Sequence, residues 1–382
     1  MGTLYNRFIK PLKRVRYGIT ITREATPTIT YLYDAVGFTP ASMNYSTGVF
    51  DWGSWADTPL IQSIYPIVTS GGSDNTTVGY KLNPNNLTQK IDGTPIDDPL
   101  TGNVATAFEG GWLHTETDTS VIPNTYTVVW SNVQWDSTYQ AYHRMNHNNS
   151  DGTVYSSFAL GVYCDTGLGT KSAINWFQYN YIISLLRIIG KTTHVLDVFG
   201  TGYSGTVTKG IGDTAGAFYG FNKSGNVSTN YSKIFYLEQF FGNDNALTGL
   251  RGQASGYTYL AEFYYNGSWV HTTSEYTKYA PNGATSSAGY VGFNRINGYH
   301  SFDVDYGLVP RYYGNAQAYT VKGADWPNWD FEASFPYLSS SASPHAYLYL
   351  RYMRKTTTHL NMYHSSDSTE YSSGKRTVQF IS

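Results

Sequence analysis

The alternation of apolar and polar residues with a period of two is the feature that most constrains the fold of this chain. It occurs in "YGITIT" at residues 17–22, in "TITYLY" at residues 28–33 and in "NTYTVVW" at residues 124–130. Successive side chains of a strand point to opposite faces, so each of these segments predicts a strand with one buried face. Turn-forming Gly, Pro and Asn separate such segments along the chain. The pattern therefore predicts a fold made mainly of β-sheet.

The composition agrees with a β-rich chain that is large enough for more than one unit. The 382 residues include 38 glycines and 36 tyrosines, and only 14% are charged. Tyrosine is enriched in strands and glycine in turns. The formal net charge of −2 gives the whole chain no attraction to polyanions.

One segment, "SAINWFQYNYIISLLRIIGK" at residues 172–191, breaks the alternation. Its polar residues fall on one narrow stripe at helical spacing. They are Asn180, Ser184, Arg187 and Lys191. Ser172 is the predicted N-cap and Gly190 the predicted end. The sequence therefore predicts one long helix that other elements wrap, and an α+β fold overall.

Residues 1–24 carry six basic side chains and one acid, Glu24. The basic residues are Arg7, Lys10, Lys13, Arg14, Arg16 and Arg23. We interpret the segment as a basic arm that attaches to a larger assembly, with all of these except Arg23 as attachment residues. A solvated tail is the alternative. Nucleic acid is not the favoured partner, because few aromatic residues are interleaved with the charges.

Several classes of protein are disfavoured by what the sequence lacks. A single cysteine, Cys164, allows neither an intrachain disulfide nor a cysteine-rich metal site. No apolar run approaches the roughly 20 residues of a membrane span, and the first residues lack the apolar core of a signal peptide. We expect a chain made in a cytoplasm, with no membrane span and no cofactor.

Carboxylates that could act in pairs occur at two places. Glu109, Glu116 and Asp118 lie in a stretch that reads as turn-rich, and Asp303 and Asp305 alternate onto one face of a predicted strand. Such pairs can serve a glycosidase or bind calcium. An exposed strand face is the more common reason for this spacing, so no catalytic residue is assigned.

Two histidines, His143 and His147, have the spacing of metal ligands on a helix. Their Asn-rich surroundings favour a loop, so no metal ligand is assigned either. A loop of the phosphate-binding type is also absent, because the Gly-rich segment follows the helix rather than preceding it. The sequence therefore favours a protein that is not an enzyme.

Aromatic residues next to Asn, Asp or Gly are the main candidates for ligand binding. A sugar ring offers a C–H face that stacks on an aromatic ring and hydroxyls that bind amides and carboxylates. "DWGSWAD", "RYYGNAQAY" and "DWPNWDF" have this character. The candidate residues are Trp52, Trp55, Tyr312, Tyr313, Trp326, Trp329 and Asp330. A place in a β core is the alternative for each ring.

The stretch "KIFYLEQFFGN" at residues 233–243 raises the question of whether Glu238 is a catalytic site. We interpret Glu238 as the anchor of a turn, with the phenylalanines in the core. Gly242–Asn243 has the residue types of a turn with positive φ.

Three further segments carry a family resemblance. "INWFQYNYIISLLRIIGKTTHVLDVFGTG", "GAFYGFNKSG" and "IFYLEQFFGN" resemble, in this order, a module of phage virion and tail-tip proteins. The order is similar to the C-type-lectin-like fold of the formylglycine-generating-enzyme type. "GLVPRYYGNAQAY", "VKGADWPNWDFEASF" and "AYLYLRYMRK" resemble its closing strands, with Gly323, Trp326 and Arg351 or Arg354 at its recurrent positions.

The resemblance covers roughly residues 55–355, and the sequence departs from it at defined positions. One cysteine cannot supply the active-site pair of the enzyme branch, so that activity is not implied. Phe240–Phe241 stands where Trp-Trp is usual, and "WPNWD" only approaches the calcium signature of sugar lectins.

The resemblance implies a phage virion surface protein, such as a head fibre, tail fibre or tail-tip adhesin. Together with the charge pattern and the alternation, it gives four predicted regions: a basic arm at residues 1–24, a β-rich virion-attachment region at 25–130, a C-type-lectin-like domain at 131–355 and, beyond the resemblance, a C-terminal strand or tail at 356–382. The expected partners are other virion proteins and a host surface glycan. The expected state is a homo-oligomer, with a trimer favoured, assembled in the host bacterial cytoplasm and located in the virion.

Two alternatives stay open. One is a purely structural capsid decoration or tail component without a ligand. The other is a glycan-degrading virion enzyme, which would need two carboxyl groups about 5–10 Å apart across a cleft. "RTVQFIS" at residues 376–382 reads as a strand, and we expect it to pair with a neighbouring subunit.

Overall fold

The structure is a computed structural model of the chain, and it describes the parts of the sequence that follow. They are residues 13–22, 27–44, 49–69, 75–76, 78–96, 104–118, 120–123, 125–145, 153–162, 174–192, 195–199, 220–222, 231–238, 240, 250–255, 258–265, 268–271, 277–278, 295–296, 299–300, 308–312, 318–323, 332–336, 347–353, 359–364 and 378–381. Between residues 250 and 364 the description covers the backbone.

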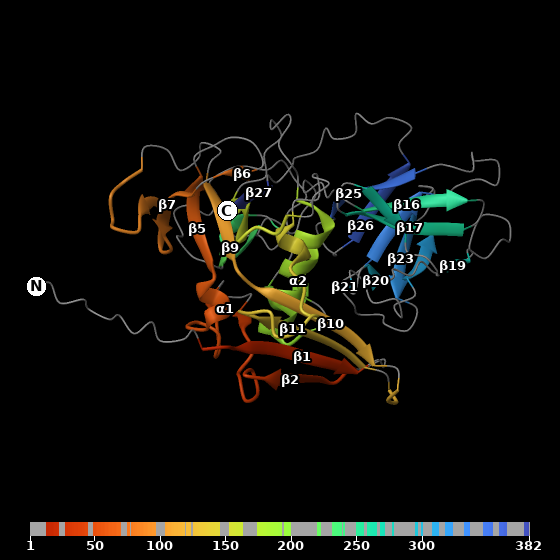
Figure 1. The fold of residues 1–382 in the computed structure, drawn as a ribbon, viewed down its shortest axis with the longest axis horizontal. Coiled ribbons are helices and arrows are strands. Elements are labelled where there is room, and N and C mark those ends of the chain that lie inside the picture. The colour runs from red at the N-terminus through yellow and green to blue at the C-terminus, as the bar shows by residue number, and fades with distance from the viewer. Residues whose placement is uncertain are drawn as a thin grey trace, which may run out of the picture.

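Strand is the main secondary structure of the described residues, as the alternation predicts (Figure 1). A four-stranded antiparallel sheet has the order β10-β11-β1-β2. Its strands are β1 Arg16–Thr22, β2 Ile29–Tyr33, β10 Trp112–Asp118 and β11 Thr125–Ser131. Ile19 faces Val128 across the β1–β11 pair, and both are fully buried. The period of two thus gives this sheet its core face.

The first strand lies inside the segment predicted as a basic arm. β1 begins at Arg16 and pairs on both sides, with β11 and with β2. Val15 and Tyr17 are buried in the core. Residues 16–22 are therefore part of a sheet, and the structure differs here from the expected arm at residues 1–24.

A seven-stranded sheet has the order β6-β27-β12-β9-β5-β7-β8. Its strands are β5 Ile64–Thr69, β6 Asn75–Thr76, β7 Val78–Asn83, β8 Asn86–Lys90, β9 Val104–Glu109, β12 Ser157–Gly161 and β27 Val378–Ile381. β27 pairs antiparallel with β12 and parallel with β6. All four of its residues are buried. The C-terminal strand therefore pairs within its own chain, and the expected pairing with a neighbouring subunit is corrected.

The longest described helix is α2, Trp176–Gly190, within the segment predicted as helical. It lies against β1 and β11 (Figure 1). Asn175, not Ser172, is its N-cap. Gly190 is the last helical residue, as predicted, and Lys191 is the C-cap with a φ of 47°. The polar stripe is itself covered, since Asn180, Ser184 and Arg187 are all buried. The other helices are α1 Pro59–Gln62, η1 Tyr142–Arg144 and α3 Val195–Phe199.

Two small strand groups complete this part of the chain. β3 Ser42–Asn44 pairs with β4 Val49–Asp51. β13 Gly220–Asn222, β14 Tyr231–Ile234 and β15 Leu237–Glu238 form a three-stranded sheet.

A separate nine-stranded sheet occupies residues 250–364 of the chain. Its strands are β16 Leu250–Ser255, β17 Thr258–Tyr265, β18 Ser268–His271, β19 Thr277–Lys278, β22 Leu308–Tyr312, β23 Ala318–Gly323, β24 Glu332–Pro336, β25 Tyr347–Met353 and β26 His359–His364. β20 Arg295–Ile296 and β21 Tyr299–His300 form a pair of their own. β24 and β26 pair in parallel, and the other strand pairs of the sheet are antiparallel.

One hydrophobic core crosses residue 130, where a boundary between two regions is predicted. It joins Val128 of β11, Phe158 of β12, Ile182 of α2 and Phe380 of β27. Residues on both sides of that position therefore share a single buried cluster.

The stretch "KIFYLEQFFGN" contains its turn in its middle. Phe235 and Tyr236 connect β14 to β15, with φ angles of 49° and 62°. A two-residue hairpin turn of this kind requires positive φ at both positions and usually takes Asn-Gly. Here both residues are buried aromatics. The described turn is therefore at Phe235–Tyr236, and the predicted Gly242–Asn243 turn lies outside the described residues.

Candidate functional site

A hollow of about 370 Å³ lies where the loop after β4, helix α1, strands β5 and β7, and the β14–β15 turn meet. We call it the aromatic hollow. It is lined by Trp52, Ala56, Ile61, Gln62, Ile64, Tyr65, Pro66, Lys81, Leu82, Pro84, Ile91 and Tyr236. Its volume is near the lower end of the range that small-molecule sites occupy. It is therefore large enough for one small ring compound or for one unit of a longer chain.

Turn chemistry fixes the side of the hollow that carries Trp52. Gly53 has a φ of 57°, and a Cβ atom there would meet the carbonyl oxygens of Thr39 and Pro40. The Gly53 amide also donates to Asp51 Oδ1 at 2.9 Å. Trp52 is only partly buried and packs edge-on against Phe50, with ring centroids 5.1 Å apart. The turn therefore leaves part of the indole at the surface.

Helix capping fixes the neighbouring wall. Thr58 is the N-cap of α1, and its hydroxyl accepts from the Ile61 amide at 3.4 Å and donates to the Trp55 carbonyl at 2.9 Å. Pro59 occupies the first helical position, where its missing N–H has no cost. The short helix presents Ile61 and Gln62 to the hollow.

A cation–aromatic contact joins the strands on the opposite wall. Lys81 Nζ lies 3.7 Å from the ring centroid of Tyr65. Lys81 is on β7 and faces Ile67 of β5, two positions from Tyr65, so both side chains stand on one face of the sheet. Burial and the hydrogen-bonded, negatively charged Glu109 raise the pKa of the Tyr65 hydroxyl. The phenol therefore stays neutral and is a hydrogen-bond donor across the physiological range.

Tyr236 reaches the hollow from the strained β14–β15 turn. Its side chain is buried with Leu82 and Val104, and burial raises its pKa. The Thr106 hydroxyl donates to the Phe235 carbonyl at 2.8 Å, which ties the turn to β9. A non-glycine residue at positive φ typically costs on the order of 1–3 kcal/mol, and such strain is concentrated at functional sites. The surrounding core holds two such residues in place here.

The lining combines aromatic rings, aliphatic side chains, one amide and one ammonium group. Ile91 at its edge is 66% exposed, which leaves apolar surface in contact with water. None of the described lining residues is a carboxylate or a nucleophile of the Ser, Thr or Cys type. The arrangement suits binding of a ring with apolar faces and polar edges. The described lining contains no pair of carboxyl groups of the kind a glycosidase needs.

The structure separates the two tryptophans of "DWGSWAD". Trp52 lines the hollow, whereas Trp55 is fully buried. The Trp55 indole donates to the Tyr31 hydroxyl at 3.4 Å and packs edge-on against Phe38 at 5.0 Å. Trp55 therefore belongs to the core, and its prediction as a ligand-binding residue is corrected.

The side chains of the other predicted ligand-binding residues are not among those that the structure describes. Tyr312 is described as the last backbone residue of β22. Tyr313, Trp326, Trp329 and Asp330 lie outside the described residues.

Of the lining residues, the sequence predicted only Trp52; the aromatic and polar residues it missed are Gln62, Tyr65, Lys81 and Tyr236. Lys81 and Tyr65 meet only because β5 pairs with β7, and the sequence does not specify that register. The interpretation of the stretch at residues 233–243 places the phenylalanines in the core and does not single out Tyr236. Its position in a turn has no glycine, asparagine or aspartate to reveal it.

Two predicted attachment residues stack on one tryptophan outside the hollow. The guanidinium carbons of Arg14 and Arg16 lie 4.4 Å and 4.2 Å from the Trp135 ring centroid. Arg16 also lies 3.6 Å from the ring of Tyr33. Lys13 and Arg14 are exposed, whereas Arg7 and Lys10 lie outside the described residues.

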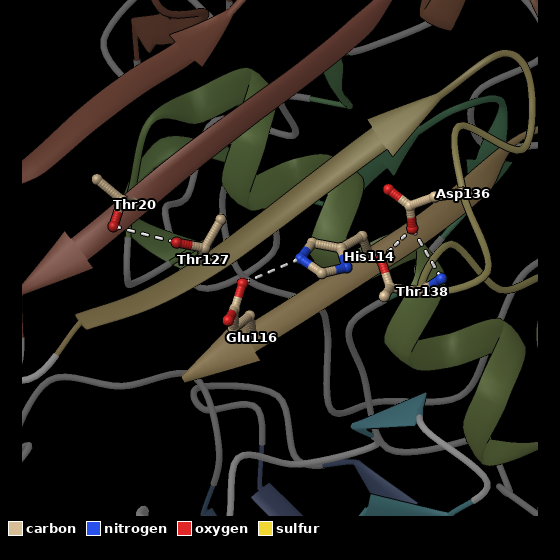
Figure 2. Close-up of polar contacts among 6 residues, drawn as sticks. All are labelled: Thr20, His114, Glu116, Thr127, Asp136 and Thr138. Carbon is tan, nitrogen blue, oxygen red and sulfur yellow. Dashed lines mark hydrogen bonds and ion pairs between the residues drawn. The ribbon is translucent and has the colours of Figure 1, made fainter. Parts of the chain in front are cut away.

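The sequence predicts a turn-rich stretch around Glu116 and Asp118, but the structure places both carboxylates on a strand, β10. Glu116 and Asp118 stand on strand β10, where His114 Nε2 lies 3.4 Å from Glu116 Oε2 (Figure 2). Asp136, which Figure 2 also shows, accepts from the amide of Thr138 at 2.8 Å. A hydrogen bond from the Thr138 hydroxyl, together with this one from its amide, lowers the pKa of Asp136. These contacts belong to the outer face of β10 and to a nearby turn.

The predicted histidine pair is described only at His143. This residue is in η1, fully buried, with its ring stacked 3.7 Å from that of Tyr181. His147 lies outside the described residues. Within the described part of the chain, no three His, Cys, Asp or Glu residues form a group that could hold a metal. No helix in that part has the length and apolar character needed to span a bilayer.

Comparison of the chain with protein-family models, with curated proteins and with solved structures gives no match in any of the three.

Proposed function

We propose that this chain is a non-catalytic surface protein of a phage particle, and that it binds a host glycan in the aromatic hollow. The observation that carries the glycan part is the lining of the hollow. Trp52 and Tyr65, which are only partly buried, supply aromatic surface for the C–H faces of a sugar, and Gln62 and Lys81 supply hydrogen bonds to its hydroxyls. This combination of apolar walls and a few polar groups is typical of small-molecule sites.

Attachment to a particle is supported by the resemblance to phage virion proteins and by exposed basic residues. Lys13 and Arg14 are exposed immediately before β1. The proposal gives residues 131–355 a C-type-lectin-like fold and places other virion proteins at the basic end. The protein would then be assembled in the bacterial cytoplasm and located in the virion.

Copy number is part of the proposal. One small, solvent-open site binds a sugar weakly, and several linked sites raise the apparent affinity by a factor of about 10²–10⁴. We therefore favour a homo-oligomer, with a trimer as the expected state.

A ligand-free structural role is the second candidate, and the burial of many described rings favours it. Trp55, Trp130, Phe108 and Phe158 are all fully buried or nearly so. Aromatic residues at these positions are explained by the core alone.

A glycan array with the purified full chain, presented on beads to give many copies, tests the proposal. We expect binding to a subset of bacterial surface glycans and a loss of about tenfold or more in affinity for Trp52→Ala. The matched control is Trp135→Ala, which removes a partly buried indole that does not line the hollow.

The absence of binding at any copy number would overturn the proposal and favour the structural role. Equal losses of glycan affinity in Trp52→Ala and Trp135→Ala would show that binding does not depend on the hollow. Release of reducing ends from a bound polysaccharide would instead indicate a glycan-degrading enzyme.

A further inference from the structure

Lys81 is the only charged residue among the described residues that line the aromatic hollow. Its side chain is exposed, and its described contact is with the Tyr65 ring at 3.7 Å. No described carboxylate lies within ion-pair distance of its ammonium group. Glu109, which is hydrogen bonded to Tyr65, does not line the hollow. The lining therefore has an uncompensated positive charge.

An uncompensated ammonium group beside apolar walls favours an anionic ligand over a neutral one. Hydrogen bonds between charged partners are roughly twice as strong as neutral ones. A bound anion would keep the Lys81 contact with Tyr65, since an ammonium group has three donors.

The number of cations indicates the kind of anion. A carboxylate carries one negative charge, which one lysine can balance. A phosphate monoester carries about −1.5 to −2 charges and three acceptor oxygens, and it is commonly met by arginine clusters. The described lining contains no arginine.

We propose that the aromatic hollow selects an acidic sugar residue, a pyranose with a carboxylate substituent. The sugar ring lies against the aromatic lining, and its carboxylate pairs with the ammonium group of Lys81. This inference rests on the proposed glycan-binding function and specifies the ligand class of the same site.

The chain offers a matched control lysine on the neighbouring strand. Lys90 is on β8, and its Nζ lies 4.7 Å from the ring centroid of Tyr80. It therefore has the same kind of cation–aromatic contact as Lys81 but does not line the hollow. Lys81→Gln and Lys90→Gln remove the same charge from adjacent strands of one sheet.

The test measures binding of the full chain to carboxylated bacterial polysaccharides before and after chemical reduction of their carboxyl groups. Reduction converts each uronic acid into the neutral hexose without changing the linkages. We expect reduction to weaken binding about tenfold or more, and Lys81→Gln to weaken binding of the unreduced polymer to the same extent. Lys90→Gln should bind as the unsubstituted chain does, and thermal melting checks that both variants are folded.

Other results would overturn the acid selectivity, the carboxylate assignment, the role of Lys81 or glycan binding as a whole. Equal binding before and after reduction, with Lys81→Gln unchanged, overturns acid selectivity and leaves glycan binding intact. Tighter binding to phosphate-substituted glycans, lost on dephosphorylation, overturns the carboxylate assignment. Equal losses in both lysine variants would indicate a general charge effect and overturn the role of Lys81. No binding to any polymer removes the proposed function and this inference with it.

Discussion

Gly111 brings the backbone close to the buried pair Trp130 and Tyr181. The Trp130 indole donates to the Tyr181 hydroxyl at 2.9 Å. A Cβ atom on Gly111 would lie 2.7 Å from Trp130 Nε1 and would also meet the Tyr181 hydroxyl oxygen. Gly111 also has a φ of 79°. Only glycine therefore fits this position without displacing two large buried side chains.

The neighbouring glycine provides the matched comparison for a stability prediction. Gly110 has a φ of 61° but has open space around its Cβ position. Gly110→Ala should lower the free energy of unfolding by about 1–2 kcal/mol through backbone strain. Gly111→Ala should add overpacking of about 1–3 kcal/mol to that. Urea denaturation of both variants checks this, and equal losses would contradict it.

Two core tyrosines predict the response of stability to alkaline pH. Burial raises the pKa of Tyr17 and of Tyr31 to about 12, from 10.0. Above pH 10 the unfolded state therefore loses phenolic protons that the folded state keeps. The stabilising effect is complete below pH 10, and it decreases as the pH rises from 10 to 12.

Urea denaturation at pH 9 and pH 11 measures this effect. We expect the free energy of unfolding to fall between the two values by up to about 1.4 kcal/mol per tyrosine. Tyr31→Phe should make the decrease smaller, although it also removes a hydrogen bond to the Ile189 carbonyl. The same decrease with and without Tyr31 would contradict the assignment.

Sequence reasoning at the residue scale recovered chemical types but not positions. Trp52 and Trp55 share one short motif, yet one lines the hollow and the other is in the core. The exposure of Trp52 depends on the Gly53 turn, and the burial of Trp55 depends on Tyr31 and Phe38, which pack against it. Contacts of this kind arise from the fold and are not encoded in local spacing.

Helix α2 begins with a reciprocal pair of hydrogen bonds. Asn175 Oδ1 accepts from the amides of Phe177 at 2.9 Å and Gln178 at 3.2 Å. Gln178 Oε1 accepts in return from the Asn175 amide at 2.9 Å. The Gln178 side chain also donates to the His143 carbonyl at 3.0 Å, which connects the helix start to η1. The same residues therefore cap the helix and connect it to η1, a separate element of the fold.

Removal of this cap should destabilise the chain measurably. Asn175→Ala should lower the free energy of unfolding by about 0.5–2 kcal/mol, because two buried amides lose their acceptor. Asn175→Ser keeps a capping oxygen and should lose less. Urea denaturation measures both, and a serine variant as unstable as the alanine variant would argue against capping as the cause.

Elements were predicted well where the pattern is long and poorly where it is short. The apolar segment at residues 172–191 contains the helix, but its N-cap is Asn175 and not the predicted Ser172. The spacing Asn175-x-x-Gln178 is a capping-box signal that could have identified the correct start. The Phe235–Tyr236 turn has no such signal, because aromatic residues rarely occupy positive φ.

At the scale of the whole molecule, the core depends on a strand from the far end of the sequence. β27 lies between β6 and β12 in the seven-stranded sheet. Val378, Phe380 and Ile381 are buried in it, and Tyr155 packs against Phe380 with ring centroids 5.4 Å apart. The Ser156 hydroxyl also donates to the Ile381 carbonyl at 2.8 Å.

Truncation after Lys375 should destabilise strands of the seven-stranded sheet that are distant in sequence from the deleted residues. Burial of three apolar side chains contributes on the order of 5 kcal/mol, and β12 also loses its neighbour. Amide hydrogen exchange should show lost protection in β12 and β9. A synthetic peptide of residues 376–382 should restore it in trans, and unchanged protection in the truncated chain would contradict the assigned pairing.

The mainly β character of the molecule was predictable because period-two alternation is a local property. The long-range arrangement was not, since the same alternation fits many pairings of strands. β27 was recognised as a strand, but its partner is β12 and not another subunit. Likewise, the core that crosses residue 130 depends on packing between segments that are distant in the sequence.

The place of β27 in the sheet also has a consequence for biosynthesis. The nine-stranded sheet of residues 250–364 is translated after β15 and before β27. Ribosomes add roughly 5–20 residues per second, so β12 waits on the order of ten seconds for its final neighbour. During that interval the nascent chain exposes an unpaired strand edge to every other polypeptide nearby. Chaperone capture at this stage would govern the yield of the finished protein.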